Sequence, residues 1–204
     1  MDNFYFEQLE NNGFSAKVFP PHFRIEITRE TIKGWLEKQL QGQCVWMEQY
    51  NEIVSWCNDN KGQGLLLMGK PGQGKTLFAR HTLPVVFCLS RIEPLAYTRT
   101  YQYSDLEDKT KVVEMCQCGN KCIIIDDIGN ENTMSYGQET GAFSRVVDSA
   151  EKYGKILIIT TNLTTDEIHK RYGERVMSRL KKLCRLIVLD GEDLRVRQLE
   201  PGHG

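Results

Sequence analysis

The sequence lacks several features that would place it in a specialised class of protein. It has no run of about 18 or more apolar residues, so we expect no transmembrane helix. Its first residues, Met1–Phe4, lack the features of a secretory signal peptide. Neither sign of charge is in excess, because 26 basic and 27 acidic side chains leave a net charge of −1. With no global basic field, any nucleic-acid site must be a local patch.

A glycine-rich segment is the most informative stretch that the chain does contain. The apolar run Leu65–Met68 leads directly into Gly69–Thr76, which fits the pattern G-x-x-x-x-G-K-[ST] at every fixed position. A helical pattern opens at Leu77. Strand, glycine-rich turn and helix is the context that a phosphate-binding loop requires. The alternative interpretation is a chance match in an ordinary turn between a strand and a helix.

The chemistry of this segment follows from the geometry of such loops. Gly72 and Gly74 let the backbone curl so that several N–H groups point at a phosphate, and the next helix adds its positive end. We expect Lys75 to reach the β- and γ-phosphates and the Thr76 hydroxyl to ligate Mg²⁺. The predicted cofactors are therefore ATP and Mg²⁺. The residues predicted to contact the nucleotide are Gly69, Pro71, Gly72, Gln73, Gly74, Lys75, Thr76 and Leu77.

Polar side chains end two further apolar runs. Asp126 and Asp127 follow Cys122–Ile125, at the end of a predicted parallel strand where ligands bind in open sheets. We assign Asp126 to the metal ion and Asp127 to the attacking water. A turn with two solvated acids is the alternative. Asn162 follows the strand Ile156–Ile159, and we expect it to hydrogen-bond the γ-phosphate and the water. An N-cap role for Asn162 or Thr164 is compatible with that assignment.

Strands alternating with helices predict a parallel α/β sheet that is covered on both faces. Thr28 is expected to cap the first helix. Residues 1–28 are expected to be loosely structured or to form a short arm. The predicted helices cover residues 29–41, 45–58, 75–88, 104–115, 138–152, 165–171 and 173–182. The predicted strands cover residues 65–68, 95–101, 121–127, 156–159 and 186–189. We divide the chain into an N-terminal arm with helices, 1–60, and an ATPase domain, 61–204.

Several segments together resemble the AAA+ ATPases, and more narrowly the helicase-loader and transposition-helper branch of DnaC-like and IstB-like proteins. The segments that carry the resemblance are Gly69–Thr76, Ile123–Gly129 with Glu131, Ile158–Leu163, Arg171–Leu180 and Gly191–Arg195. The resemblance implies a P-loop NTPase fold of the ASCE type. This fold is a three-layer sandwich around a parallel five-stranded sheet, without a C-terminal lid domain.

The resemblance also implies roles for residues outside the loop. Arg179 matches the arginine finger, which reaches the γ-phosphate held by a neighbouring subunit, and Arg175 matches a second arginine one turn earlier. Arg195 matches an arginine that acts on the phosphates of its own subunit, and Glu131 joins the catalytic set. A fixed guanidinium offsets negative charge on the transferred phosphoryl group. Without the resemblance, Arg175 and Arg179 would be interpreted as a solvated basic helix face.

The implied function is an ATP-hydrolysing accessory protein of DNA replication, a helicase loader that assembles on single-stranded DNA. Its expected partners are further copies of the chain and a replicative helicase. One alternative is a transposition helper that binds duplex DNA and a transposase, and another is a small-molecule kinase. A patch of basic and aromatic residues would suit single-stranded DNA: Arg99, Tyr101, Tyr103, Lys109 and Lys111. Seven cysteines beside a nucleotide motif favour a reducing cytoplasm over a disulfide framework.

Overall fold

The computed structural model describes residues 18–41, 44–90, 99–102, 121–129 and 136–191. For residues 99–102 and 136–140 it describes only the backbone. The elements follow the chain in this order: α2 (Arg29–Gln39), α3 (Tyr50–Asn58), β1 (Gly64–Gly69), η1 (Leu77–Thr82), α4 (Leu83–Leu89), β2 (Arg99–Gln102), β3 (Cys122–Ile128), α6 (Tyr136–Lys152), β4 (Ile156–Thr161), α7 (Thr165–Tyr172), α8 (Glu174–Leu183) and β5 (Cys184–Leu189).

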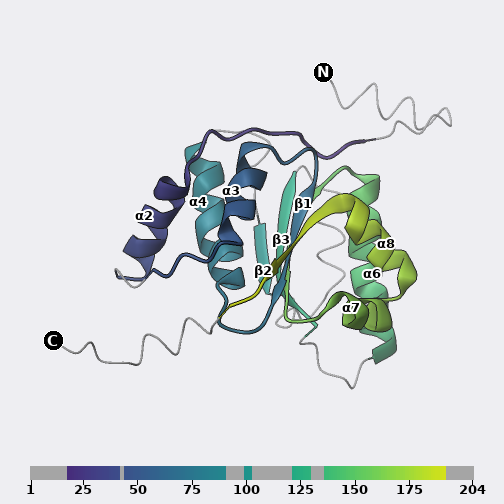
Figure 1. The fold of residues 1–204 in the computed structure, drawn as a ribbon. Coiled ribbons are helices and arrows are strands. Elements are labelled where there is room, and N and C mark those ends of the chain that lie inside the picture. The colour runs from purple at the N-terminus through teal and green to yellow at the C-terminus, as the bar shows by residue number, and fades with distance from the viewer. Residues whose placement is uncertain (1–17, 42–43, 91–98, 103–120, 130–135, 192–204) are drawn as a thin grey trace.

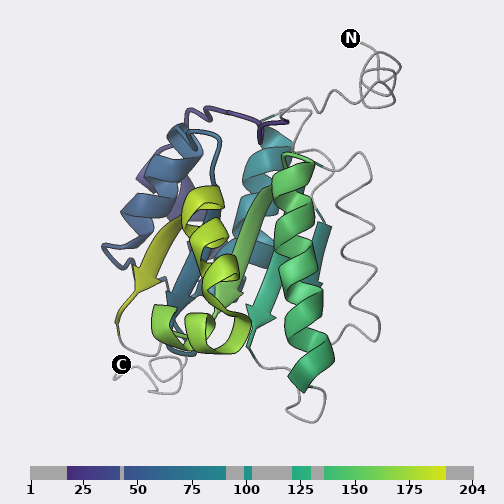
Figure 2. The same ribbon diagram turned by 90° about the vertical axis from the view of Figure 1, so that its right-hand side faces the viewer.

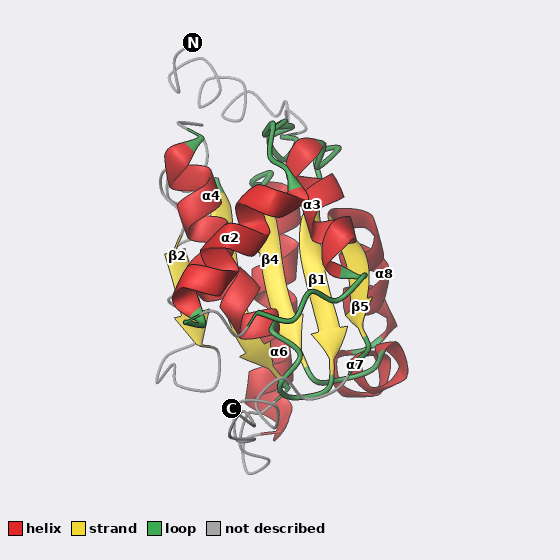
Figure 3. Cartoon of the chain, turned by 60° about the vertical axis from the view of Figure 1, so that its left-hand side comes forward, coloured by secondary structure: helices red, strands yellow, loops and turns green. Residues whose placement is uncertain are grey.

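The described strands form one sheet in the order β2-β3-β4-β1-β5, and every neighbouring pair is parallel. Strands β1 and β4 are not consecutive in the chain but lie side by side with Leu66 opposite Ile159, so the chain crosses over between them. The predicted parallel α/β fold is therefore confirmed. All carboxyl ends of the strands meet at one edge of the sheet, which is where the sequence places its polar residues (Figure 3).

Helices cover both faces of the sheet. Successive side chains of each strand point to opposite faces, so each strand contributes to a hydrophobic core on either side. Figure 1 shows α2, α3 and α4 on one side of the strands and α6, α7 and α8 on the other. In β1, Leu65 and Leu67 pack in a cluster with the first group of helices. Leu66 and Met68 pack in a second cluster with the other group. A strand buried on both faces explains why the run carries no polar residue.

The segment before α2 is part of the first core rather than an appendage. Phe23 and Ile25 are buried, and the N–H of Ile25 donates to the Cys57 carbonyl at 2.9 Å. The buried side chain of Asn60 accepts from the N–H of Phe23 at 2.8 Å. The expectation of loose structure is thus wrong for residues 23–27, because the alternate apolar side chains of Phe23, Ile25 and Ile27 are buried in the core. The domain boundary at about residue 60 stays a prediction.

Some helices and strands begin where the sequence predicts, and others begin a few residues earlier or later. Thr28 caps α2 as predicted, since its hydroxyl accepts from the N–H of Thr31 at 3.2 Å. The second helix begins at Tyr50 rather than at about residue 45. The last strand begins two residues earlier than expected, at Cys184. The predicted helix over 104–115 lies outside the described residues, and so does any C-terminal lid, since the description ends at residue 191.

The helix after the glycine-rich loop contains an irregular turn that the sequence analysis missed. η1 has the wider π-helical hydrogen-bond pattern, and α4 follows it with Pro84 in its first turn. Proline has no N–H to donate to the carbonyl four residues earlier, that of Arg80, and its ring clashes there. A local widening relieves both problems. The hydroxyl of Thr82 donates to the Leu77 carbonyl at 3.2 Å and ties the widened turn together.

The described part of the chain contains no helix that combines the length and the apolar character needed to cross a bilayer.

Candidate nucleotide site at the carboxyl edge of the sheet

The loop after β1 has the backbone shape that the glycine pattern predicts. Gly72 and Gly74 have φ angles of +83° and +79°, a region that residues with a Cβ rarely adopt. At Gly69 an added Cβ would lie 2.2 Å from the Leu189 carbonyl oxygen and 2.3 Å from Oε1 of Gln73. All three glycines are therefore required, the first by the close approach of β5 and the others by the curl of the loop.

The side chain of Lys75 lies over this curl. It is buried, and its Nζ donates to the carbonyls of Gly69 at 2.7 Å and Lys70 at 2.8 Å. These two carbonyls hold the ammonium group against the loop. We expect it to reach a bound phosphate from this position. An anionic ligand there would form stronger, charge-assisted hydrogen bonds with the same group.

The carboxylate of Asp126 is the buried centre of the site. Its Oδ1 accepts hydrogen bonds from the hydroxyls of Thr76 at 3.1 Å and Thr160 at 2.5 Å. The guanidinium of Arg80 lies 3.9 Å from its Oδ2. The two residues predicted to hold Mg²⁺, Thr76 and Asp126, are thus in direct contact. A hydroxyl and a carboxylate are oxygen donors of the kind that Mg²⁺ prefers, so this pair fits the predicted ion.

Asp127 is set apart from Asp126 by its backbone. Its φ is +63°, which is uncommon for a residue other than glycine, and the pairing of β3 with β4 shifts register between Ile125 and Ile128. Because of this irregularity, the side chain of Asp127 does not follow the regular alternation of side chains along β3. Nδ2 of Asn162 donates to Oδ1 of Asp127 at 3.3 Å. The structure therefore brings together the two polar groups that the sequence assigns to the attacking water.

Thr160 joins the two aspartates, and the sequence analysis gave it no role. Its buried hydroxyl donates to Asp126 and accepts from the N–H of Asp127 at 2.8 Å. One side chain from β4 thereby fixes both the first carboxylate and the turned backbone of the second. The available signal was a threonine at the end of an apolar run. Only the pairing of β3 with β4 shows which residues it faces.

Helix α3 and the residues that follow β5 also contact the loop, through Gln73. The hydroxyl of Tyr50 in α3 donates to the Gln73 carbonyl at 3.1 Å. The Gln73 side chain is buried and donates from Nε2 to the Gly191 carbonyl at 2.8 Å. Burial raises the pKa of Tyr50, so its hydroxyl remains a donor. Gln73 thus uses its side chain within the protein, which leaves only its backbone for the nucleotide contact that we predict.

The two arginines of α8 contact another helix rather than the loop. Arg175 lies 2.8 Å from Asp148 of α6, and Arg179 lies 2.6 Å from both Asp148 and Glu151 of α6. Within the described ranges, no hydrogen bond or ion pair joins either arginine to the aspartates of the site. This separation is compatible with a function in a neighbouring subunit, which stays a prediction.

The other predicted site residues are distributed as follows. Pro71 and Thr76 are exposed, and Leu77 is half-buried at the start of η1. Glu131 and Arg195 lie outside the described residues. The same holds for three members of the basic and aromatic patch: Tyr103, Lys109 and Lys111. Arg99 and Tyr101 belong to β2, for which the structure gives the backbone alone.

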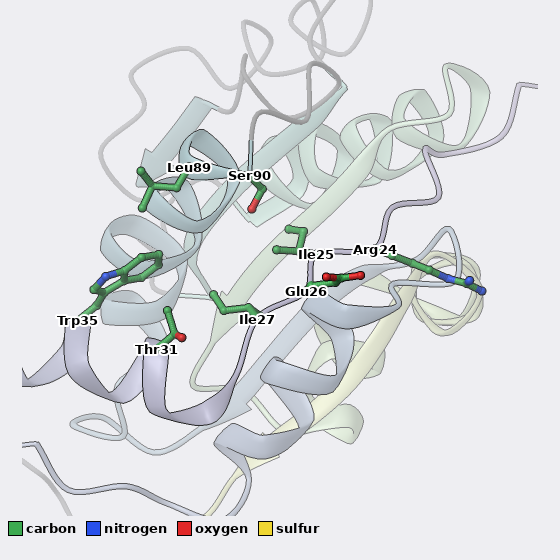
Figure 4. Close-up of a pocket in the computed structure, with 8 residues that line it drawn as sticks. All are labelled: Arg24, Ile25, Glu26, Ile27, Thr31, Trp35, Leu89 and Ser90. Atoms are coloured by element: carbon green, nitrogen blue, oxygen red, sulfur yellow. The ribbon is translucent and has the colours of Figure 1, made fainter.

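A separate recess of about 350 Å³ lies between the extended segment before α2, the helix α2 itself and the end of α4 (Figure 4). Its lining residues are Arg24, Ile25, Glu26, Ile27, Thr31, Trp35, Leu89 and Ser90. None of them belongs to the glycine-rich loop or to the ends of β3 and β4. The recess is therefore distinct from the candidate nucleotide site.

Comparisons with known proteins agree with this architecture. A family model described as RNA helicase matches residues 65–155. The crystal structure of the DnaC helicase loader aligns at 23% identity and a TM-score of 0.50, over 63% of this chain and 78% of that one. AMPPCP-bound DnaA from Aquifex aeolicus aligns at 15% identity and a TM-score of 0.51, over 74% of this chain and 50% of that one. A comparison with curated protein sequences found no significant match.

The expected likeness to the DnaC helicase loader is found, and at these identities what the chain shares with the aligned structures is the fold. The chain has the α/β P-loop architecture of both aligned structures, with a parallel sheet. The matched range of the family model includes the glycine-rich loop and the paired aspartates. The loop and the two carboxylates thus lie in the part of the chain that this family model matches.

The contacts of Thr160 give a first prediction. Replacing it with valine keeps the shape but removes both hydrogen bonds, one of them to a buried carboxylate. We expect the free energy of unfolding to fall by about 2–4 kcal/mol, measured by urea denaturation. Thr160→Ser is the matched control, because it keeps the hydroxyl and should cost about 1 kcal/mol. Equal stability of the two variants would show that the hydroxyl does not hold the aspartates.

Proposed function

Because the chain has the P-loop fold of the DnaC and DnaA structures, we propose that it binds ATP with Mg²⁺ and hydrolyses the γ-phosphate as an accessory ATPase of DNA replication. The observation that carries the proposal is the convergence of three groups at one edge of the sheet. These are the Lys75 ammonium over the curled loop, the Thr76 hydroxyl and the buried Asp126 carboxylate. They match the parts with which P-loop enzymes hold a nucleoside triphosphate.

Each residue then has a defined task. The loop N–H groups and Lys75 hold the phosphates, and Thr76 and Asp126 hold the ion, which neutralises charge on the phosphate oxygens when bound. Asp127 accepts a hydrogen bond from the attacking water and Asn162 orients it. The contact of 3.3 Å between these two side chains supports that pairing.

Arg179 and Arg175 complete the site from a neighbouring copy of the chain. Both lie on α8, and no hydrogen bond or ion pair in the described segments links them to Asp126 or Asp127 of their own subunit. A guanidinium supplied across an interface stabilises the charge of the transferred phosphoryl group. Turnover therefore requires self-association.

The biological setting that we infer is helicase loading on single-stranded DNA in the cytoplasm, with a replicative helicase as partner. The likeness to the DnaC helicase loader supports this choice over the alternatives. A transposition helper would use the same ATPase on duplex DNA with a transposase. A small-molecule kinase would need an acceptor pocket and would have no need for the α8 arginines.

The loop assignment predicts the effect of removing one charge. Lys75→Met should weaken binding of a fluorescent ATP analogue at least about tenfold, because the charge-assisted hydrogen bonds to phosphate are lost. Lys70→Met is the matched control, since this exposed lysine of the same loop contributes only its carbonyl to the contacts described. Unchanged affinity in Lys75→Met would refute the nucleotide site.

The finger assignment predicts complementation between two inactive proteins. Arg179→Ala should still bind ATP but lose nearly all turnover, because its neighbour's phosphate lacks the cation. Mixing it with Lys75→Met, whose own site is empty but whose finger is intact, should restore activity measured as phosphate release. Lys181→Ala, another basic residue of α8, serves as the control and should keep turnover. No gain on mixing would count against action across an interface.

The choice of partner predicts which polymer stimulates turnover. Addition of single-stranded DNA should raise phosphate release more than an equal mass of duplex, since loaders act on exposed strands. Stronger stimulation by duplex would instead support the transposition helper. Transfer of labelled phosphate to a nucleoside or other small acceptor would support the kinase.

A further inference from the structure

The two arginines of α8 form ion pairs with acidic residues of α6 in their own subunit. Nε of Arg179 donates to Oε2 of Glu151 at 2.6 Å, and one terminal nitrogen lies 2.6 Å from Oδ1 of Asp148. The other carboxylate oxygen of Asp148 accepts from Arg175 at 2.8 Å. Lys182 donates to the remaining oxygen of Glu151 at 2.5 Å. Two acids of α6 therefore engage three cations of α8.

This seam of five charges is built into the packing of two helices. Asp148 and Glu151 are three residues apart on α6, and Arg175 and Arg179 are four apart on α8, so each pair lies on one face of its helix. Figure 2 shows the two helices side by side over the same face of the sheet. The Arg179 side chain is only 26% exposed, whereas that of Arg175 is 69% exposed. Arg179 is thus the more firmly held of the two.

These contacts engage two of the three guanidinium nitrogens of Arg179. A guanidinium binds phosphate through its N–H groups in a fixed, planar arrangement. Arg179 directs its Nε and one terminal nitrogen at two separate carboxylates in the isolated subunit. It cannot present the same groups to an external phosphate without leaving one or both acids. The acids of α6 therefore compete with the nucleotide for this side chain.

Building on the proposed function, we propose that Asp148 and Glu151 form an intramolecular latch, which withholds Arg179 and Arg175 until a second copy of the chain offers its bound nucleotide. Assembly exchanges the carboxylates for phosphate oxygens. The latch raises the concentration at which subunits associate, because its contacts must be given up when the arginines engage a neighbour. Lys182 supports the latch. Its hydrogen bond to Glu151 is the largest cause of the lowered pKa of that acid, and the hydrogen bond from Arg179 is the next largest. The lowered pKa keeps Glu151 charged.

The test neutralises the latch without changing its shape. In Asp148→Asn with Glu151→Gln, the side chains keep their size and an acceptor oxygen but lose their charge. Assembly with a nonhydrolysable ATP analogue, followed by sedimentation velocity, should need a roughly threefold to tenfold lower subunit concentration. Phosphate release at a fixed low concentration should rise by a similar factor. The single substitutions are measured as well, so that an unstable double variant does not prevent a decision.

Two comparisons isolate the latch from other effects of charge. Glu37→Gln removes an acid that pairs with Lys33 on α2, at 3.6 Å, and should change neither assembly nor turnover. In an Arg179→Ala background, neutralising the α6 acids should give no gain in turnover, because there is no finger to release. A gain that persists without Arg179, or the same assembly concentration as the unmodified protein, would overturn the latch.

The outcomes separate this inference from the function on which it rests. If Arg179→Ala and Lys75→Met fail to complement each other, the finger role is refuted and the latch falls with it. If they complement and the neutralised variant behaves like the unmodified protein, the latch alone is refuted. Complementation together with easier assembly supports both.

Discussion

The buried carboxylate of Asp126 is the interaction on which the site depends. It receives the hydroxyl of Thr76 from the start of the loop helix and that of Thr160 from the neighbouring strand. A buried charge is costly unless it is hydrogen-bonded in this way. The carboxylate therefore couples the loop after β1 to the ends of β3 and β4, so the groups proposed to hold phosphate, metal and water share one rigid edge.

The same edge is held from outside the sheet by residues far away in the chain. Tyr50 contacts the backbone of Gln73, and Gln73 reaches past the loop to Gly191. Helix α3 thus contacts the glycine-rich loop directly. Its side chains belong to the first of the two cores, where Trp56 and Tyr50 are fully buried. This packing links stability of the N-terminal segment to the shape of the proposed nucleotide site.

The helices on the two faces of the sheet contribute differently to the proposed site. The face with α2, α3 and α4 braces the loop, whereas the face with α6, α7 and α8 carries the charges that we propose to act between subunits. Arg179 contacts two carboxylates of its own chain, and we propose that it also acts on the nucleotide of a neighbouring copy. A side chain that has both an internal and an external acceptor can respond to assembly without any change of fold.

The sequence by itself determined the features that depend on neighbouring residues. Apolar runs predicted four of the strands closely, and the spacing of Gly69, Gly74 and Lys75 predicted a loop that the structure confirms as a curled turn. The paired aspartates were predicted to lie at the ligand-binding edge because parallel strands end together. Each of these inferences needs only local pattern and the geometry of one element.

Only the tertiary structure decided which distant residues meet. Thr160 lies between Asp126 and Asp127 because β4 pairs with β3 in one register, and Arg179 meets Glu151 because α8 packs beside α6. The positive φ of Asp127 likewise arises from a constraint that a pattern of residue types does not record. Contacts between residues about 30 positions apart depend on how the elements pack, and packing is settled by the whole core at once.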